Sequence, residues 1–220
     1  MAYMDAFRAN TAPLIKSIGE GNAHMIWAIA LYLEEPDVEA LASEALTDGP
    51  DDKKIDFIYL DRDAKRVIFA QGYYGLGKKD SAPANKASDL NTAGAWLFSG
   101  DLDKAPIQLR STIEECRAAL DEGEVDTIEL LYVHNYPESV NVSKELQTAA
   151  DHLKKVIGEK PDILVSSREL GSSAIDHLFL ALVSNITIKD DITCPTQIKF
   201  SEDGPNWTAA VMSVPGDRKS

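Results

Sequence analysis

Two residues on neighbouring predicted strands carry the side chains best suited to chemistry in this chain. Asp56 lies near the start of a strand expected over 54–60, and Gln71 lies near the end of the next strand, expected over 66–74. A metal-dependent nuclease core carries an acid on one such strand, then an acid or glutamine followed two residues later by lysine on the next. Here Tyr73 stands at the lysine position. If both strands belong to one site, the pattern predicts a nuclease-like site whose lysine is lost or relocated.

The register of this hairpin decides whether the two side chains meet. With Leu60 paired to Lys65 across the turn, Asp56 lies opposite Phe69, and Gln71 is its diagonal neighbour on the same face. Because side chains alternate with a period of two, a slip of one residue moves Gln71 to the other face. The joint site is therefore expected only in this register.

Length and composition limit the class of protein. The chain has 220 residues, enough for a full core, and its 44% hydrophobic and 26% charged content is ordinary for a soluble globular protein. No apolar run is long enough to span a membrane, and the first residues lack the order of a secretory signal. Two isolated cysteines, Cys116 and Cys194, are typical of a reduced protein. We therefore expect a cytoplasmic protein that does not interact with a membrane.

The net charge of −14 argues against nucleic-acid binding through a broad basic surface. It does not exclude a nuclease, because an acidic site needs only bound cations and a local basic rim. Strong affinity for nucleic acid is then expected from elsewhere in a longer polypeptide.

Helical and strand patterns alternate along the chain and predict an α/β fold with a mixed β-sheet flanked by helices. A short N-terminal arm precedes helices expected at 22–34, 38–46, 83–98, 107–120, 142–157 and 173–183. Beyond the hairpin, strands are expected at 127–133 and 162–165, then at 186–188, 197–200 and 207–214. The pattern thus predicts an α/β domain over 1–185 and a β-rich segment over 186–220 that begins a following domain.

The order of these features resembles a known family. A helix, the turn-rich Asp48-Gly49 segment, the Ile55-Asp56 strand and a strand ending at Gln71 are similar to the N-terminal region of the abortive infection phage resistance proteins. Those proteins look like distant members of the PD-(D/E)XK nuclease superfamily. The resemblance continues through 132–135 and the tail at 207–216, so it covers most of the chain through short motifs. It implies a restriction-endonuclease-like core, and the greater length of family members implies that this chain is an N-terminal piece.

The resemblance also implies a function, metal-dependent cleavage of phosphodiester bonds in DNA or RNA during bacterial phage defence. Asp56 would be the central ligand of Mg²⁺ or Mn²⁺, and Gln71 would supply an amide oxygen. An acid of the first predicted helix, Glu20 or else Glu34, would complete the ligand set. The metal in such sites activates water and neutralises charge that develops on the phosphate.

The departure from the family pattern lies at Tyr73. A neutral tyrosine cannot replace the charge of an ammonium that stabilises the transition state. Lys78 or Lys79 in the following loop, or Lys86 on the next predicted helix, would have to supply that charge. Equally open is a catalytically inactive module that recognises a phage or host protein or mediates assembly. Self-association into a homo-oligomer also stays open.

Each candidate residue has a structural interpretation as well. Asp56 can be a solvent-facing residue beside a turn, Gln71 can satisfy backbone groups at a strand end, and Glu20 suits the first turn of a helix. Lys86 lies three residues before Asp89, which is the spacing of an exposed ion pair. The family resemblance is what favours the functional hypothesis.

A rival motif occupies the loop after the second strand. The segment 72–78 matches the Gly-x4-Gly-Lys of a phosphate-binding loop, but Lys79 follows where serine or threonine would coordinate magnesium. Tyr73 and Tyr74 are bulky for such a loop, and Pro83 delays the next helix. Nucleotide hydrolysis is therefore disfavoured.

Histidine is the remaining residue type with catalytic potential. His24, His134, His152 and His177 show no metal-ligand spacing with one another or with cysteine. His134 and Asn135 end a predicted central strand, at the edge where α/β proteins often bind ligands. A structural role through hydrogen bonds is the commoner outcome for such residues.

Overall fold

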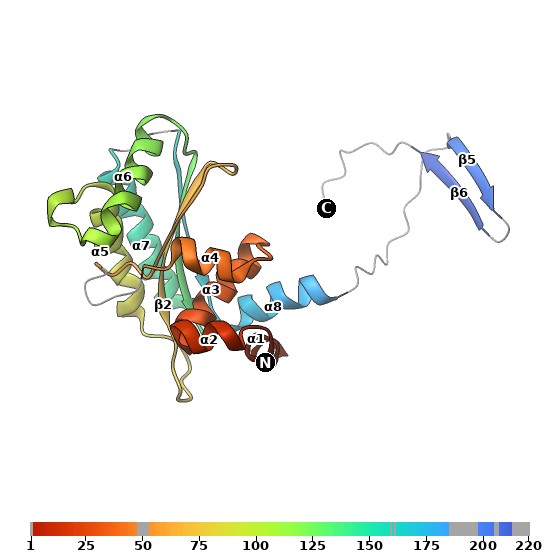
Figure 1. Cartoon of the computed structure of the whole chain (residues 1–220), viewed down its shortest axis with the longest axis horizontal. Coiled ribbons are helices and arrows are strands. Elements are labelled where there is room, and N and C mark those ends of the chain that lie inside the picture. Colours follow the sequence, from red (N-terminus) through yellow and green to blue (C-terminus); the bar gives the residue numbers. More distant parts are fainter. Residues whose placement is uncertain are drawn as a thin grey trace. The chain divides into compact units, whose positions relative to one another are not determined.

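In the described part of the chain, a four-stranded mixed sheet organises this computed structural model (Figure 1). The strand order is β1-β2-β3-β4, and β1 (Phe57–Asp61) runs antiparallel to β2 (Arg66–Tyr73). β3 (Thr127–His134) and β4 (Leu164–Leu170) continue the sheet in parallel with β2. Both parallel pairs are joined by helical crossovers, because a tight turn cannot connect parallel strands. The prediction of an α/β fold with a mixed sheet flanked by helices is confirmed.

The structure describes residues 2–47, 53–158, 160, 162–184, 198–204 and 207–212. The chain divides into two compact units after Val183. In the second unit, β5 (Ile198–Gly204) and β6 (Trp207–Met212) form an antiparallel pair. Cys194, the Asp48-Gly49 segment and the strand expected at 186–188 lie outside the described residues.

Helices cover both faces of the sheet in the larger unit (Figure 1). One face is covered by α1 (Ala2–Asn10), α2 (Ala12–Ile18), α3 (Glu20–Leu33), α4 (Val38–Ala45) and α8 (Ser172–Val183). The other face is covered by α5 (Ala84–Phe98), the short η1 (Leu102–Lys104), α6 (Ile107–Asp121) and α7 (Val140–Val156). The six predicted helices are all present, with ends displaced by two residues or fewer. Among the described residues, none of these helices has the length and apolar character to cross a membrane.

Successive side chains of each strand point to opposite faces of the sheet and contribute to two separate hydrophobic cores. Phe69 and Leu130 pack with α5, α6 and α7, whereas Ile68 and Leu131 pack with the helices of the opposite face. All four side chains are fully buried. Gln71 follows Phe69 by two positions in β2, so it belongs to the face that α5 covers.

The N-terminal segment differs from the prediction, because the expected arm forms two helices, α1 and α2. Tyr3 and Phe7 lie four residues apart on α1, which places both on one side of the helix, and both are fully buried. Pro13 lies in the first turn of α2, where proline is tolerated because its missing N–H has no intrahelical partner.

The register of the hairpin is also a correction. Leu60 pairs with Val67, two residues beyond the expected Lys65. Because the shift is even, every side chain stays on its predicted face. Asp56, directly before β1, consequently lies opposite Gln71 in the register and is no longer its diagonal neighbour.

Asp61 explains this register. Its carboxylate accepts a hydrogen bond from the Ala64 amide at 2.9 Å and pairs with the Arg66 guanidinium, also at 2.9 Å. β1 therefore extends through Asp61, and the turn moves to 62–65. Lys65 completes this turn in the left-handed region, with φ of 51°.

The fourth strand is longer and later than predicted. We expected 162–165, whereas β4 spans Leu164–Leu170. Its polar stretch, 166–169, lies at the edge of the sheet, where only part of each side chain is covered. Apolar periodicity is weak in such an edge strand, so the sequence pattern did not reveal it.

We predict that Phe69→Ala lowers the free energy of unfolding by about 3–5 kcal/mol, because it leaves a cavity between β2 and α5. Phe69 is fully buried, and its ring lies 6.4 Å from that of Phe98. Urea unfolding would measure the loss. Leu76→Ala is the control, since Leu76 is 91% exposed, and should change stability by less than about 0.5 kcal/mol. Equal effects of the two substitutions would contradict this core.

Candidate functional site

The carboxylate of Asp56 and the side-chain amide of Gln71 meet where β2 approaches its end. Gln71 Nε2 donates a hydrogen bond to Asp56 Oδ2, and the backbone N–H of Gly72 donates to the same oxygen at 2.7 Å. Asp56 exposes 9% of its surface and Gln71 exposes 4%. The structure thus brings together, in a buried position, the two residues that the sequence pattern paired.

This contact exists because β1 is shorter than β2. The last ladder bond runs from the Asp56 amide to the Ala70 carbonyl at 3.0 Å, and the Asp56 side chain then takes the next backbone donor, that of Gly72. Directly before, Lys53 and Lys54 adopt left-handed φ values of 56° and 68°. Non-glycine residues in this region cost about 1 kcal/mol or more each. Two such residues in succession mark a strained segment shortly before Asp56.

Gln71 leaves one polar atom unsatisfied. Its Oε1 is buried and has no hydrogen-bond partner in the described structure, a property shared by Asn91 Oδ1 on α5. A buried polar atom without a partner costs about 1–3 kcal/mol, so it calls for an explanation. An amide oxygen next to a carboxylate is a suitable ligand set for a hard cation such as Mg²⁺. The two residues therefore fit a divalent cation by their chemistry.

Glu20 is the first residue of α3, and its Oε1 is held from two sides. The Tyr74 hydroxyl donates to it at 2.9 Å, and Arg8 Nε donates at 3.0 Å. The hydrogen bond from Tyr74, followed by that from Arg8, lowers the pKa of Glu20. These contacts tie Glu20 to the residues that follow Gln71. Glu34, the other acid considered, caps the opposite end of α3.

Two lysines share one carboxylate on α5. Lys86 Nζ lies 3.6 Å from Asp89 Oδ2, and Lys54 Nζ lies 3.8 Å from the same atom. The Lys86–Asp89 pair has the expected spacing of three residues. Lys54 was not among the predicted candidates, although its place two residues before Asp56 was a signal in the sequence. The Lys54–Asp89 ion pair links the strained segment before Asp56 to the second turn of α5.

The Lys79 ammonium contacts Tyr73, the residue that stands where the family pattern has lysine. Its Nζ donates a hydrogen bond to the Tyr73 hydroxyl at 3.2 Å and lies 5.7 Å from the centre of the Tyr73 ring. This hydrogen bond raises the pKa of Lys79. Lys78 is exposed in the same loop, which follows β2.

A buried histidine and glutamate occupy the neighbouring strand ends. His134 Nε2 lies 3.0 Å from Glu169 Oε1, and His134 Nδ1 lies 3.0 Å from the Tyr136 carbonyl oxygen. The Ser139 amide, at the start of α7, donates to the Glu169 carboxylate at 3.1 Å. In the parallel register Tyr73 pairs with His134, so this group adjoins the end of β2. The sequence indicated His134 but missed Glu169, because the strand that carries it was expected to end earlier.

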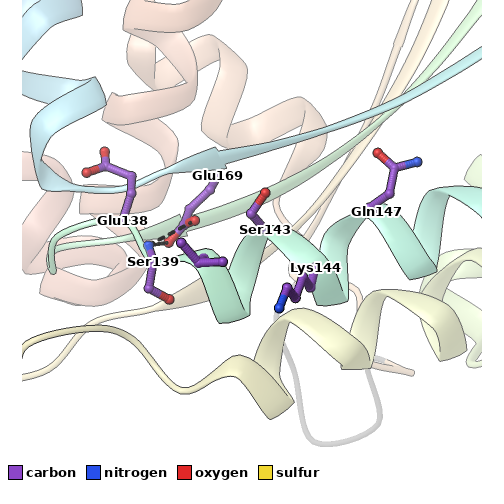
Figure 2. A pocket seen from close by; sticks show the side chains of 7 residues that line it. Glu138, Ser139, Ser143, Lys144, Gln147 and Glu169 are labelled. Atoms are coloured by element: carbon purple, nitrogen blue, oxygen red, sulfur yellow. Dashed lines mark hydrogen bonds between the residues drawn. The ribbon is translucent and has the colours of Figure 1, made fainter.

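Glu169 also lines an open hollow of about 590 Å³ at the start of α7 (Figure 2). Figure 2 shows Glu169 bound to Ser139, with Ser143, Lys144 and Gln147 along the helix. In the same region Glu138 accepts a hydrogen bond from the Ala174 amide at 2.7 Å. Through these hydrogen bonds the Glu138 and Glu169 carboxylates hold the backbone that follows β3 and β4 in place.

A group of three acids, histidines or cysteines arranged to hold a metal does not occur within the described ranges. A cation at Asp56 and Gln71 would therefore complete its shell with water and with oxygens of the substrate. Mg²⁺ commonly does this, since it keeps several waters and binds through one or two carboxylates plus phosphates.

Comparison of the chain with protein-family models, with curated protein sequences and with solved structures finds no match. The family resemblance in the short motifs therefore stays a hypothesis. The geometry of the site is the observation on which a proposed function must rest.

We predict that buried His24 makes the fold acid-sensitive. Burial, followed by the proximity of His134, lowers the pKa of His24 to about 4, although Glu20 opposes the shift. The stability gained from neutral His24 is complete above about pH 6.5, the unfolded pKa, and is lost as the pH falls toward 4. Between pH 7 and pH 4.5 this histidine should cost about 2–3 kcal/mol of unfolding free energy.

Urea unfolding of the wild type and of His24→Gln at both pH values measures this effect. Carboxylates elsewhere titrate in both proteins. The difference between the wild type and the variant in the loss of unfolding free energy from pH 7 to pH 4.5 therefore isolates the effect of His24. The substituted protein should lose less stability on acidification. An identical decline in both proteins would contradict the assignment.

Proposed function

We propose that residues 1–183 form a nuclease-like domain that cleaves phosphodiester bonds of nucleic acid in a metal-dependent reaction. The observation that carries this proposal is the buried contact between Asp56 and Gln71, whose Oε1 lacks a hydrogen-bond partner in the described structure. We equate α3 and the β1–β4 sheet with the restriction-endonuclease-like core that the family resemblance implies. A role in bacterial phage defence by abortive infection, a cytoplasmic location and a β-rich segment that begins a following domain belong to the same proposal.

Asp56 and Gln71 are the residues that would hold Mg²⁺ or Mn²⁺. When bound, such an ion would supply an activated water and would neutralise charge on the phosphate. Rotation of the Gln71 amide exchanges its Nε2 and Oε1, so the same side chain either donates to Asp56 or presents an oxygen ligand. Because both side chains are buried, the protein excludes bulk water and strengthens electrostatic interactions at this position.

Lys79 is the ammonium that the geometry favours for stabilising the transition state. Tyr73 lies two residues after Gln71 in β2, so both side chains point to the same face of the sheet. The hydrogen bond from Lys79 to the Tyr73 hydroxyl therefore brings a positive charge to the face that carries Gln71. Lys86 is less suited, because its charge is paired with Asp89.

One observation favours a second function, that of a catalytically inactive module. Asp56 Oδ2 accepts hydrogen bonds from both Gln71 and the Gly72 amide, which is sufficient to hold its carboxylate in a buried position without a metal. Such a module would recognise a phage or host protein or mediate assembly. Metal binding separates the two functions.

We predict that Asp56→Asn lowers Mg²⁺- or Mn²⁺-dependent cleavage of DNA or RNA by at least about a hundredfold, because it removes the charged ligand. A gel assay on labelled DNA and RNA would measure the rate. Asp63→Asn is the matched control, since Asp63 is an exposed acid in the turn of the same hairpin. Full activity of Asp56→Asn would show that the proposed site is wrong. A wild-type protein that neither cleaves nor binds metal would support the inactive module.

The source of the ammonium has its own test. Lys79→Met should lower kcat by about a hundredfold, because a group that stabilises developing charge acts mainly on the chemical step. Lys86→Met is the comparison and should retain most of the wild-type kcat. The opposite ranking in single-turnover cleavage would assign the ammonium to α5.

A further inference from the structure

The loop after β2 has a shape fixed by the end of β3. Asn135 Oδ1 accepts a hydrogen bond from the Gly75 amide at 3.0 Å, and Asn135 Nδ2 donates to the Gly75 carbonyl at 2.8 Å. The Tyr136 hydroxyl donates to the Gly77 carbonyl at 2.6 Å. A Cβ at Gly75 would lie 2.1 Å from the Tyr136 hydroxyl oxygen, so a side chain cannot be accommodated there without movement. Hydrogen bonds with Asn135 and Tyr136 therefore hold the shape of the loop that carries the Gly-x4-Gly-Lys motif.

This loop forms one wall of a hollow of about 580 Å³. The opposite wall contains Arg8 of α1, and the loop contributes Lys78 and Lys79. Asp80 is the acid among the lining residues, so cations outnumber acids here despite the net charge of −14. Arg8 is paired with Glu20 and Lys79 donates a hydrogen bond to Tyr73, whereas Lys78 is an exposed lysine of the loop. The hollow is thus a local basic rim on an acidic protein.

The remaining lining suits a nucleotide. Tyr74 and Tyr136 supply aromatic side chains, and cations with aromatic groups are the combination by which proteins hold single-stranded nucleic acid. A hollow of about 580 Å³ has the size of a small-molecule site and receives one nucleotide but not a duplex. Tyr74 follows the end of β2, and its side chain contacts Glu20 and His24 of α3, on the face opposite to Gln71, so a strand bound here would have to pass the end of β2 to reach the Asp56–Gln71 pair.

We propose that this hollow binds the sugar–phosphate backbone of a single nucleic-acid strand, with a phosphate at Lys78 and a base beside Tyr74. The delivery of that strand to Asp56 and Gln71 rests on the proposed function, whereas the binding itself does not. Lys78 acts here as a positioning residue that holds the strand, and Gly75 preserves the shape of the loop.

Fluorescence anisotropy with short labelled oligo(dT) and oligo(U), in EDTA and at about 50 mM salt, tests the binding. Lys78→Glu should weaken the affinity about tenfold and reduce the dependence of log K on log salt by about one, as loss of one phosphate contact requires. Gly75→Ala should weaken binding while the far-ultraviolet circular dichroism is retained. Lys155→Glu is the matched control, because Lys155 is an exposed lysine on α7, and its affinity should stay within about twofold of wild type.

Binding of either oligonucleotide supports the inference, and a preference between them identifies DNA or RNA as the source of the strand. The inference is overturned if the wild type does not bind, if duplex DNA binds as well as the single strands, or if Lys78→Glu behaves like Lys155→Glu. If the wild type binds the oligonucleotides but does not cleave them when Mg²⁺ or Mn²⁺ is added, the proposed function fails while this inference stands.

Discussion

The hydrogen bonds at Asp56 Oδ2 are the interaction on which the site depends. β1 begins at Phe57, opposite Ala70, whereas β2 continues to Tyr73. The amide of Gly72 therefore has no partner on β1, and the Asp56 carboxylate accepts its hydrogen bond. The same oxygen accepts from Gln71 and thereby directs the amide oxygen of that side chain to a buried position without a partner in the described structure. One strand-end cap thus positions a carboxylate and an amide oxygen side by side.

Much of the fold could be predicted from the sequence because the apolar periodicities are strong. The helices after Gly21 and the strand β3 followed directly from them. Asp56 and Gln71 were expected on one face as diagonal neighbours, whereas they lie directly opposite each other. The failures have local causes. The true hairpin register depends on a hydrogen bond and an ion pair of Asp61, which alternation alone does not encode. Glu169 lies in a polar edge strand whose end no apolar pattern marks.

The surroundings of the pair explain how an acidic chain can still present positive charge to a phosphate. The Lys79 ammonium donates a hydrogen bond to the Tyr73 hydroxyl, and Lys78 lies in the same loop. Hydrogen bonds hold the shape of this loop, so both positive charges have a fixed surrounding. Their positions depend on Asn135 and Tyr136 at the end of β3. The lysines could be named as candidates from the sequence, but the Asn135–Gly75 hydrogen bonds join residues 60 positions apart and are seen only in the folded structure.

The central claim is that Asp56 and Gln71 hold a divalent cation. The most direct test is anomalous X-ray diffraction from crystals of the protein soaked in Mn²⁺. We predict an anomalous peak within coordination distance of an Asp56 carboxylate oxygen and of Gln71 Oε1, and its loss in Asp56→Asn. Crystals that show no peak between these two side chains at saturating Mn²⁺, with the Gln71 amide still donating to Asp56, would contradict it.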